Sequence, residues 1–355
     1  METLTHKKIR VKFSSQYPDI PYLRQTPGSK GVWGNCEFIT DESETAFDWW
    51  FVWNNLEKPT RAYGPKNRTV LMTGEGNPDI KKYARKFIEQ FGYIISAHPE
   101  IHHPHLIRRQ VAPWMVGHFG TGSGVDPKDF KRYFTTYNTY KTMRVPEKTK
   151  LLAVVNASKN RAPGQRKRHA FISALKEHFK DTMDVFGNGI NRISDKMDGI
   201  APYQYYVMIE NAYVPGYVTG IGDVYLGHTF PFYYGCPDLE TYYSPEAFIR
   251  VDVDDPHKSI EIIEQAIIEH VYEKRTKAIK IARELTLNTY NIFAVMADFC
   301  NANADTPCVA ERVMLKPEMK RRAVPQIVAE TLRSLPGIYH VARWMYRKQI
   351  KKHHD

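Results

Sequence analysis

Apolar runs of strand length recur through the first hundred residues and are separated by polar loops. Residues 9–13 alternate apolar and basic side chains, and apolar runs cover residues 47–53, 70–72 and 93–96. Between the last two runs, apolar side chains recur at helical spacing and predict a helix over residues 79–90. An alternation of strands and helices of this kind predicts a small α/β domain.

A second set of elements follows in the middle of the chain. Residues 151–155 are expected to form a strand, and a helix over residues 168–179 presents one apolar face. Within residues 205–251, a first apolar run ends abruptly in Glu210-Asn211, a helix-length segment follows over residues 219–227, and a second apolar run covers residues 229–234. This order predicts a strand, a helix and a parallel strand, the βαβ unit of open α/β sheets. Residues 260–293 read as a long helical region.

The pattern divides the chain into parts. Residues 120–127 are rich in glycine and end in a proline, which is typical of a linker. We therefore expect a first α/β domain over residues 1–125, a linker over residues 126–148 and a second α/β domain over residues 149–290. The last part, residues 291–355, is expected to contain helices and a strongly basic tail.

Composition and charge narrow the class of protein. The chain has 355 residues, of which 42% are hydrophobic and 25% charged, as in soluble globular proteins. The net charge of +11 implies an anionic partner, and nucleotide sugars, membrane surfaces and nucleic acid all qualify. The four cysteines form no CxxC pair, and no apolar stretch reaches the length of a membrane span or a signal peptide, so we expect a cytoplasmic protein.

The order of residues in the βαβ segment resembles the α1,3/4-fucosyltransferases. The matching residues are Glu210-Asn211, Gly216-Tyr217-Val218-Thr219, Thr229-Phe230-Pro231-Phe232-Tyr233-Tyr234-Gly235, Pro237 and Ala247-Phe248-Ile249. The resemblance implies a GT-B glycosyltransferase, with two Rossmann-like domains and a cleft between them. It also implies inverting transfer of a sugar from a nucleotide-sugar donor, as in the bacterial members of the family that lack a membrane anchor.

Two residues carry the chemistry in this interpretation. Glu75 follows the apolar run 70–72 in Thr73-Gly74-Glu75, and the resemblance makes it the general base that takes the proton of the acceptor hydroxyl. Arg168 lies at the start of the predicted helix 168–179, where a guanidinium and a helix amino terminus together suit a diphosphate. The alternatives are a solvated turn glutamate and an exposed basic loop.

Further residues are expected to line the nucleotide-sugar pocket. The resemblance and their position next to predicted strand ends indicate Asn156, Glu210, Asn211, Gly216, Tyr217 and Thr219. A glycine at 216 allows close approach of the backbone, and the following helix presents its amino end to phosphate or ribose. In the alternative interpretation this stretch is a turn in which Thr219 caps the helix.

The resemblance breaks at Gly220-Ile221, where the family has a Glu-Lys pair that binds ribose and phosphate. Neither glycine nor isoleucine offers a polar group, so the donor need not be GDP-fucose, and another nucleotide sugar such as UDP-galactofuranose is the alternative. Lys159, Arg161 and Arg192 belong to the same predicted domain and are candidates to compensate.

Two segments resemble metal sites but have simpler explanations. Asp252-Val253-Asp254 lies between an apolar run and Pro256, so we expect a turn and a helix cap. The neighbouring histidines of residues 102–105 are constrained by Pro104 and are expected to form an exposed loop. No metal ion or cofactor is therefore expected, and the nucleotide sugar is a substrate.

The basic tail points to the place of action. Residues 339–350 alternate basic and apolar positions in the manner of an amphipathic helix, which suits the anionic inner face of the cytoplasmic membrane. We expect a glycan or lipid-linked glycan acceptor there, as in bacterial lipopolysaccharide and O-antigen synthesis. The rival hypotheses are a non-catalytic nucleic-acid-binding protein, for which no recognition motif is found, and a glycosyltransferase fold that serves only to bind a partner.

Overall fold

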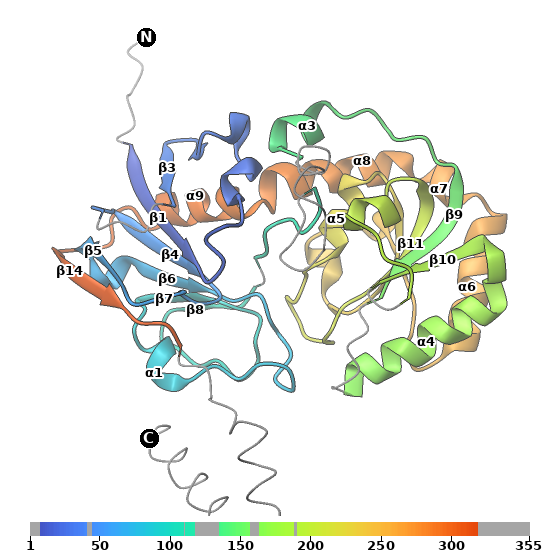
Figure 1. Ribbon diagram of the computed structural model, residues 1–355, viewed down its shortest axis with the longest axis horizontal. Helices are drawn as coiled ribbons and strands as arrows, with labels where there is room; N and C mark the ends of the chain where they lie inside the picture. The colour runs from blue at the N-terminus through green and yellow to red at the C-terminus, as the bar shows by residue number, and fades with distance from the viewer. Residues whose placement is uncertain are drawn as a thin grey trace, which may run out of the picture.

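The chain forms two α/β domains that lie side by side (Figure 1). The computed structural model describes residues 8–40, 45–109, 111–117, 135–156, 163–187 and 190–318. Each domain is built on its own predominantly parallel sheet, so the predicted architecture of two Rossmann-like domains is confirmed. No helix in these described ranges is long and apolar enough to cross a membrane.

The first domain contains a seven-stranded sheet in the order β2-β3-β1-β4-β6-β7-β8. Its strands are β1 (Ile9–Ser15), β2 (Val32–Trp33), β3 (Cys36–Ile39), β4 (Trp49–Trp53), β6 (Thr69–Met72), β7 (Tyr93–Ile95) and β8 (Leu106–Ile107). All neighbours are parallel except β2 and β3. Every residue of β4 is buried, because both faces of a parallel sheet are covered.

The predicted helix over residues 79–90 is largely wrong, since α1 spans only Arg85–Ile88. The preceding residues form a turn at Asn77, whose side chain accepts a hydrogen bond from the Asp79 amide (2.9 Å). The same side chain donates to the carbonyl oxygen of Asn211 in the second domain (2.8 Å). Contacts with distant parts of the chain thus outweigh the helical spacing of the apolar residues.

The second domain contains a five-stranded, fully parallel sheet in the order β10-β9-β11-β12-β13. Its strands are β9 (Lys150–Val155), β10 (Met183–Phe186), β11 (Tyr203–Ile209), β12 (Phe230–Tyr234) and β13 (Ile249–Arg250). The helix α5 (Ile221–Leu226) joins β11 to the parallel strand β12, so the predicted βαβ unit is confirmed. The outer helices α4 (Pro163–Phe179) and α6 (Pro256–Ile268) contact each other beside this sheet.

The predicted helical region after residue 260 is interrupted and crosses between the domains. After α6 come α7 (Val271–Lys274), α8 (Thr276–Glu284), a π-helical turn (Leu285–Thr289) and α9 (Ile292–Ala302). The breaks fall at His270, which has a left-handed φ of 52°, and at Asn291, which caps α9.

The helix α9 lies against the first sheet rather than the second (Figure 1). Its Phe293 ring is 4.9 Å from the ring of Phe38, and its Phe299 ring is 5.1 Å from that of Trp49. Further on, β14 (Ala310–Leu315) pairs with β5 (Thr60–Pro65) of the first domain. The described part of residues 291–355, which the sequence treats as a separate region, therefore completes the first domain, while residues 319–355 lie outside the described ranges. The other domain boundaries remain a prediction.

A buried arginine holds the connection between the domains. Arg24, in the 3-10 turn Tyr22–Gln25, is 1% exposed and donates to the carbonyl oxygens of Trp114 (3.1 Å), Val116 (2.8 Å) and Thr135 (2.6 Å). These three acceptors belong to the connecting chain, which the helix α3 (Tyr137–Thr142) continues. The predicted linker 120–127 lies outside the described residues.

The chain passes between the domains twice, once before α3 and again at Asn291. The neighbouring Gln25 forms hydrogen bonds with both of these connections. Its side chain exchanges two hydrogen bonds with the backbone of Trp114 (3.1 and 3.2 Å). Its carbonyl oxygen accepts from the side chain of Asn291, at the point where the chain returns to the first domain (2.8 Å). Both crossings therefore meet at one buried turn.

We predict that Arg24→Met destabilises the protein, because three buried carbonyl oxygens lose their donor. The expected cost is about 3 kcal/mol in the free energy of unfolding. Urea unfolding followed by tryptophan fluorescence measures it. Arg61→Met, which removes an exposed arginine from β5, is the control and should leave the unfolding midpoint unchanged. Equal midpoints for the two variants would contradict the structural role of Arg24.

Candidate functional site

Glu75 lies at the contact between the two domains. It follows β6, and its side chain is partly buried. Its Oε1 accepts hydrogen bonds from the Asn77 amide (2.9 Å) and from the hydroxyl of Tyr217 in the second domain (3.3 Å). The carboxylate is thus oriented from both domains, which a solvated turn glutamate would not need.

Close approach of two loops produces this contact. A side chain at Gly76 would collide with the ring of Tyr217, so only glycine lets the loop after β6 approach that ring. On the other side, Gly216 has a φ of 72°, and its amide donates to the Asp238 carboxylate (2.7 Å). Tyr217 is 2% exposed, and burial raises the pKa of its hydroxyl well above the usual value. The hydroxyl is therefore a hydrogen-bond donor at neutral pH.

Arg168 lies in α4 and reaches the same region. The helix begins at Pro163 instead of the predicted residue 168, so Arg168 stands in its second turn and not at its amino end. Its Nη1 donates to Oδ1 of Asn211 (2.8 Å). Because the Asn211 carbonyl oxygen accepts from Asn77 (2.8 Å), a chain of hydrogen bonds connects Arg168 to the loop of Glu75.

Asn156 directly follows β9 and contacts His169, the residue after Arg168. It is 2% exposed, its amide donates to the Phe186 carbonyl oxygen (2.7 Å), and its side-chain nitrogen contacts Nδ1 of His169 (3.0 Å). Among the described residues, its Oδ1 and the Nε of Arg168 are buried without a hydrogen-bond partner. Polar atoms of this kind are unusual in a protein interior, and a water molecule, an ion or a ligand satisfies them.

Glu210 orders the turn before α5. Its carboxylate accepts from the amides of Thr219 (2.8 Å) and Gly220 (3.1 Å) and from the Thr219 hydroxyl. Burial raises the pKa of Glu210, and these donors oppose the shift. The alternative role of Thr219 as helix cap is wrong. The residue at the amino-terminal cap of α5 is Gly220, and the Thr219 hydroxyl donates to Glu210 instead of binding the helix.

The two positions that depart from the family pattern have clear structural roles. A side chain at Gly220 would collide with the terminal methyl group of Met208. Ile221 is fully buried and packs in the core of the second domain. A charged side chain at Ile221 would disturb this core, whereas one at Gly220 would require only the flexible end of Met208 to move.

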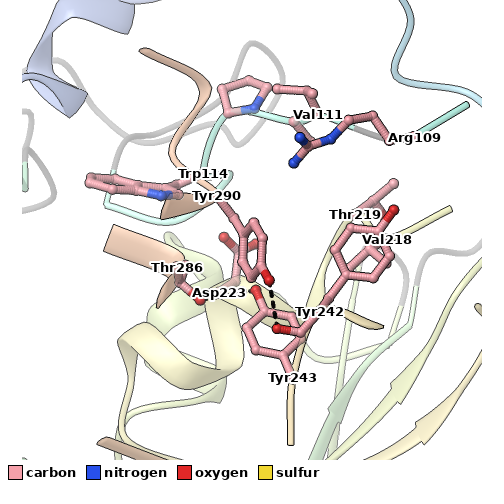
Figure 2. A pocket seen from close by; sticks show the side chains of 13 residues that line it. Arg109, Val111, Trp114, Val218, Thr219, Asp223, Tyr242, Tyr243, Thr286 and Tyr290 are labelled. Carbon is pink, nitrogen blue, oxygen red and sulfur yellow. Dashed lines mark hydrogen bonds between the residues drawn. The ribbon is translucent and has the colours of Figure 1, made fainter. Parts of the chain in front are cut away.

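A pocket that the sequence did not reveal lies between the connecting chain and the second domain (Figure 2). Its cavity volume is about 40 Å³, which is room for a few water molecules. The guanidinium of Arg109 points over it, and the Tyr290 hydroxyl donates to the Tyr242 carbonyl oxygen (2.7 Å) at its wall. Its lining also includes Trp114, Val218, Thr219, Gly222, Asp223, Tyr243 and Thr286.

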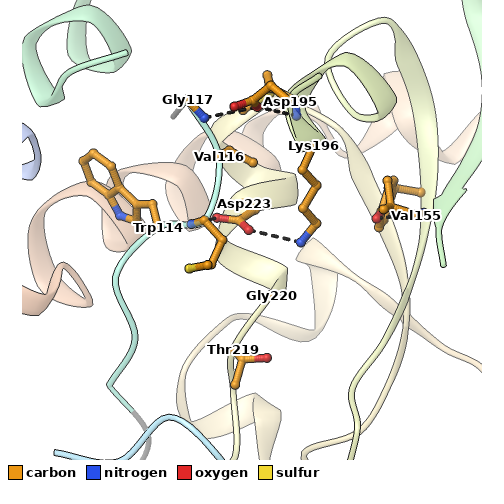
Figure 3. Close-up of polar contacts among 12 residues, drawn as sticks. Trp114, Val116, Gly117, Val155, Asp195, Lys196, Thr219, Gly220 and Asp223 are labelled. Carbon is orange, nitrogen blue, oxygen red and sulfur yellow. Dashed lines mark hydrogen bonds and ion pairs between the residues drawn. The ribbon is translucent and has the colours of Figure 1, made fainter. Parts of the chain in front are cut away.

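Two carboxylates of the second domain bind the connecting chain beside this pocket (Figure 3). Asp223 accepts from the Met115 amide (3.1 Å) and pairs with the ammonium of Lys196 (3.1 Å). Asp195 accepts from the amides of Gly117 (3.1 Å) and Met197 (2.7 Å). Nothing in the sequence distinguishes Lys196, which the structure brings to this place.

Of the three residues expected to compensate, the structure describes one. Lys159 and Arg161 lie outside the described residues, and Arg192 is exposed. Both metal-like segments have the simple structures expected of them. The Asp252 carboxylate accepts from the Asp254 amide (2.9 Å), while Asp255 caps α6. The histidines of residues 102–105 lie in the loop before β8, and His103 contacts the Phe91 carbonyl oxygen (3.1 Å). Across the described ranges, no cluster of three or more His, Cys, Asp or Glu side chains could hold a metal ion.

Comparison with known proteins supports the resemblance noted in the sequence. Residues 145–269, about a third of the chain, match the family described as glycosyltransferase family 10 (fucosyltransferase), C-terminal part. The second domain is therefore that of a fucosyltransferase-like glycosyltransferase. No curated protein sequence matches the chain.

Several solved structures resemble the whole chain at low sequence identity. An α1,3-fucosyltransferase with GDP-fucose is 15% identical, with a TM-score of 0.48, over 87% of this chain and 94% of its own. An α1,3-fucosyltransferase crystal structure is 16% identical (TM-score 0.43; 82% and 94% covered). A glycosyltransferase from Rickettsia africae is 7% identical (TM-score 0.40; 84% and 98% covered). At these scores the likenesses add nothing to what the family match supports.

The buried carboxyl of Asp195 predicts a dependence of stability on pH. Burial raises its pKa from 3.8 to about 6, so the unfolded chain ionises at lower pH than the folded protein. Stability should therefore fall as the pH rises from about 4 to 6, and the full penalty remains at higher pH. Asp195→Asn keeps an acceptor for Gly117 and Met197 but does not titrate. Its stability relative to the wild type should rise between pH 4 and pH 7 by up to about 3 kcal/mol.

Urea unfolding of both proteins at the two pH values measures this difference. Asp79→Asn, which removes an exposed carboxylate from the first domain, is the control for the loss of one negative charge. A stability difference that stays constant over this pH range would disprove the assignment to Asp195.

Proposed function

We propose that this chain is an inverting, metal-independent glycosyltransferase of bacterial surface-polysaccharide synthesis. It would move a sugar from a nucleotide diphosphate donor to a glycan. The observation that carries the proposal is the contact between Glu75 and Tyr217 across the two domains. It brings a carboxylate of the first domain to the loop that, by the resemblance, belongs to the donor site.

Glu75 suits the role of general base. An acceptor hydroxyl attacks the anomeric carbon of the donor, and its proton passes to the Glu75 carboxylate as the new carbon–oxygen bond forms. The hydrogen bonds from Asn77 and Tyr217 go to Oε1, so they hold the carboxylate in one orientation. A base held in position in this way reduces the entropy that must be lost in the transition state.

Arg168 suits stabilisation of the leaving group. As the bond between the anomeric carbon and the phosphate oxygen breaks, negative charge accumulates on the nucleoside diphosphate. A guanidinium near the cleft offsets that charge, which is the role that a metal ion has in other transferases. The unpartnered atoms of Asn156 and Arg168 offer a polar surface for the same ligand.

The donor is proposed to differ from GDP-fucose. Neither Gly220 nor Ile221 has a polar side chain, and Ile221 is fully buried in the core of the second domain. UDP-galactofuranose is the alternative donor that the sequence suggests. Thermal-shift measurements with a panel of nucleotide sugars would identify the donor.

The acceptor is proposed to be a glycan or lipid-linked glycan at the inner face of the cytoplasmic membrane. The basic residues of the tail support this, because clustered lysine and arginine side chains bind anionic lipid surfaces. The tail lies outside the described residues, so the support comes from its sequence alone.

Glu75→Gln should abolish most of the transfer and leave the donor bound. The amide keeps the size of the side chain and can still accept from Asn77 and Tyr217, but it takes up no proton. We expect transfer to fall by about 100-fold or more. Product formation with radiolabelled donor, together with donor affinity by calorimetry, separates the two effects. Glu89→Gln, an exposed change in the same domain, is the control. Transfer near the wild-type rate would show that Glu75 is not the base.

Arg168→Met should weaken the binding of a free nucleoside diphosphate, measured by calorimetry in excess EDTA. Loss of a hydrogen bond to a charged group corresponds to about a tenfold weaker affinity or more. Arg144→Met, which removes an exposed arginine, is the matched control. If the wild type bound the diphosphate only after Mn²⁺ was added, metal-independent binding would be refuted. An unchanged affinity in the variant would remove Arg168 from the site.

A further inference from the structure

Lys196 reaches the carboxyl-terminal edge of the second sheet from a different direction than Arg168. It opens the 3-10 turn Lys196–Gly199, which follows β10, and its side chain is directed towards Gly220 (Figure 3). A side-chain carbon placed on Gly220 would lie 3.4 Å from the Lys196 ammonium. The absence of a side chain at Gly220 thus leaves the ammonium beside the turn that precedes α5.

Lys196 and Arg168 both lie near the end of β11. The Gly220 amide, beside the Lys196 ammonium, donates to Glu210 (3.1 Å), and Arg168 donates to the adjacent Asn211 (2.8 Å). The place where β11 ends and α5 begins is the usual position of phosphate groups in open α/β sheets. Two cations there would form a cradle for a diphosphate.

The ammonium of Lys196 retains hydrogen-bonding capacity. Among the described residues, Asp223 is its hydrogen-bond partner, so two of its three N–H groups are left for another acceptor. Its side chain is 23% exposed, against 3% for that of Asp223. Although burial lowers the pKa of Lys196, the charge of Asp223 raises it above its usual value, so the group stays charged.

The carboxylates nearby are already satisfied by other donors. Glu210 accepts from Thr219 and Gly220, and Asp223 also accepts from the Met115 amide. A buried pair of Lys196 and Asp223 alone would contribute little net stability, because desolvation offsets the attraction. Binding of a negatively charged ligand would explain why the ammonium of Lys196 is held at this position.

We propose that Lys196 binds the diphosphate of the nucleotide-sugar donor together with Arg168, beside the turn at Gly220 that precedes α5. This inference rests on the proposed function and adds a residue to the same site. Lys196 would then supply the positive charge that Ile221 lacks. Selectivity for diphosphates would come from a turn far from α5 in the sequence.

The test compares Lys196→Met, Lys196→Arg and the double variant Lys196→Met/Asp223→Asn in the full chain. Calorimetry with GDP and UDP measures the diphosphate affinity, and guanosine and uridine report the base and ribose alone. Lys196→Met should weaken binding of the preferred diphosphate by about tenfold or more and leave its nucleoside unaffected. Lys196→Arg should keep most of the affinity.

The double variant separates binding from structure, because it leaves no unpaired buried carboxylate. Its melting temperature should recover towards the wild-type value while the diphosphate affinity stays low. Lys150→Met is the matched control, since it removes another lysine–aspartate pair (Lys150–Asp184, 2.8 Å) at the opposite end of the same sheet. Its diphosphate affinity should equal that of the wild type.

Two outcomes would overturn the inference and are distinguishable. If the double variant regained both stability and wild-type diphosphate affinity, Lys196 would serve only to neutralise Asp223, and the proposed function would stand. If the wild type bound neither GDP nor UDP, the donor site itself would be refuted, and the role of Lys196 with it.

Discussion

The arrangement of the two domains depends on the buried guanidinium of Arg24. It is bound by three carbonyl oxygens of the connecting chain and lies near the carboxylates of Asp195 and Asp223, which partly offset the loss of its hydration. An arginine without these partners would be too costly to bury. The adjacent Gln25 adds the returning chain at Asn291 to the same cluster. The two crossings are thereby held together, and the relative position of the sheets follows from this.

The polar network of the cleft depends on that position. Glu75 and Asn77 belong to the first domain, whereas Asn211 and Tyr217 belong to the second, and the hydrogen bonds among them exist only when the domains meet. Hydrogen bonds through Asn77 and Asn211 connect Glu75, the proposed base, to Arg168, which is proposed to bind the diphosphate. A change in domain position would therefore alter both at once, which suits an enzyme that must assemble its site around two substrates.

Several buried acids of the second domain act through other groups. The Glu210 carboxylate accepts hydrogen bonds from the turn before α5. The carboxylates of Asp195 and Asp223 accept hydrogen bonds from the connecting chain. Lys196 pairs with Asp223 (Figure 3), and Arg109 lies at the adjacent pocket (Figure 2). Sequence resemblance predicts that Glu210 belongs to the donor site, and in the structure its carboxylate holds the loop of Thr219.

The sequence by itself determined the two parallel sheets and the βαβ unit of β11, α5 and β12. Long apolar runs that end in polar residues have few other solutions, because a strand buried on both faces must be apolar throughout. It also determined that Glu75 and Asn211 follow strands of those sheets, whereas Arg168 lies in the second turn of α4 and not at the predicted helix start. The sequence did not predict the structure of residues 79–90. Local spacing favours a helix there, but the turn at Asn77 contacts the second domain and only a short helix forms.

Only the tertiary structure decided which residues meet. Lys196 lies 24 positions before Gly220 along the chain, and no periodicity or local pattern connects the two. The pocket beneath Arg109 is built from four separate segments, and α9 belongs to the first domain although it follows the second. The local pattern of apolar residues indicates only whether a segment forms a helix or a strand and which of its faces is buried. Contacts between distant segments arise from packing that no single segment contains.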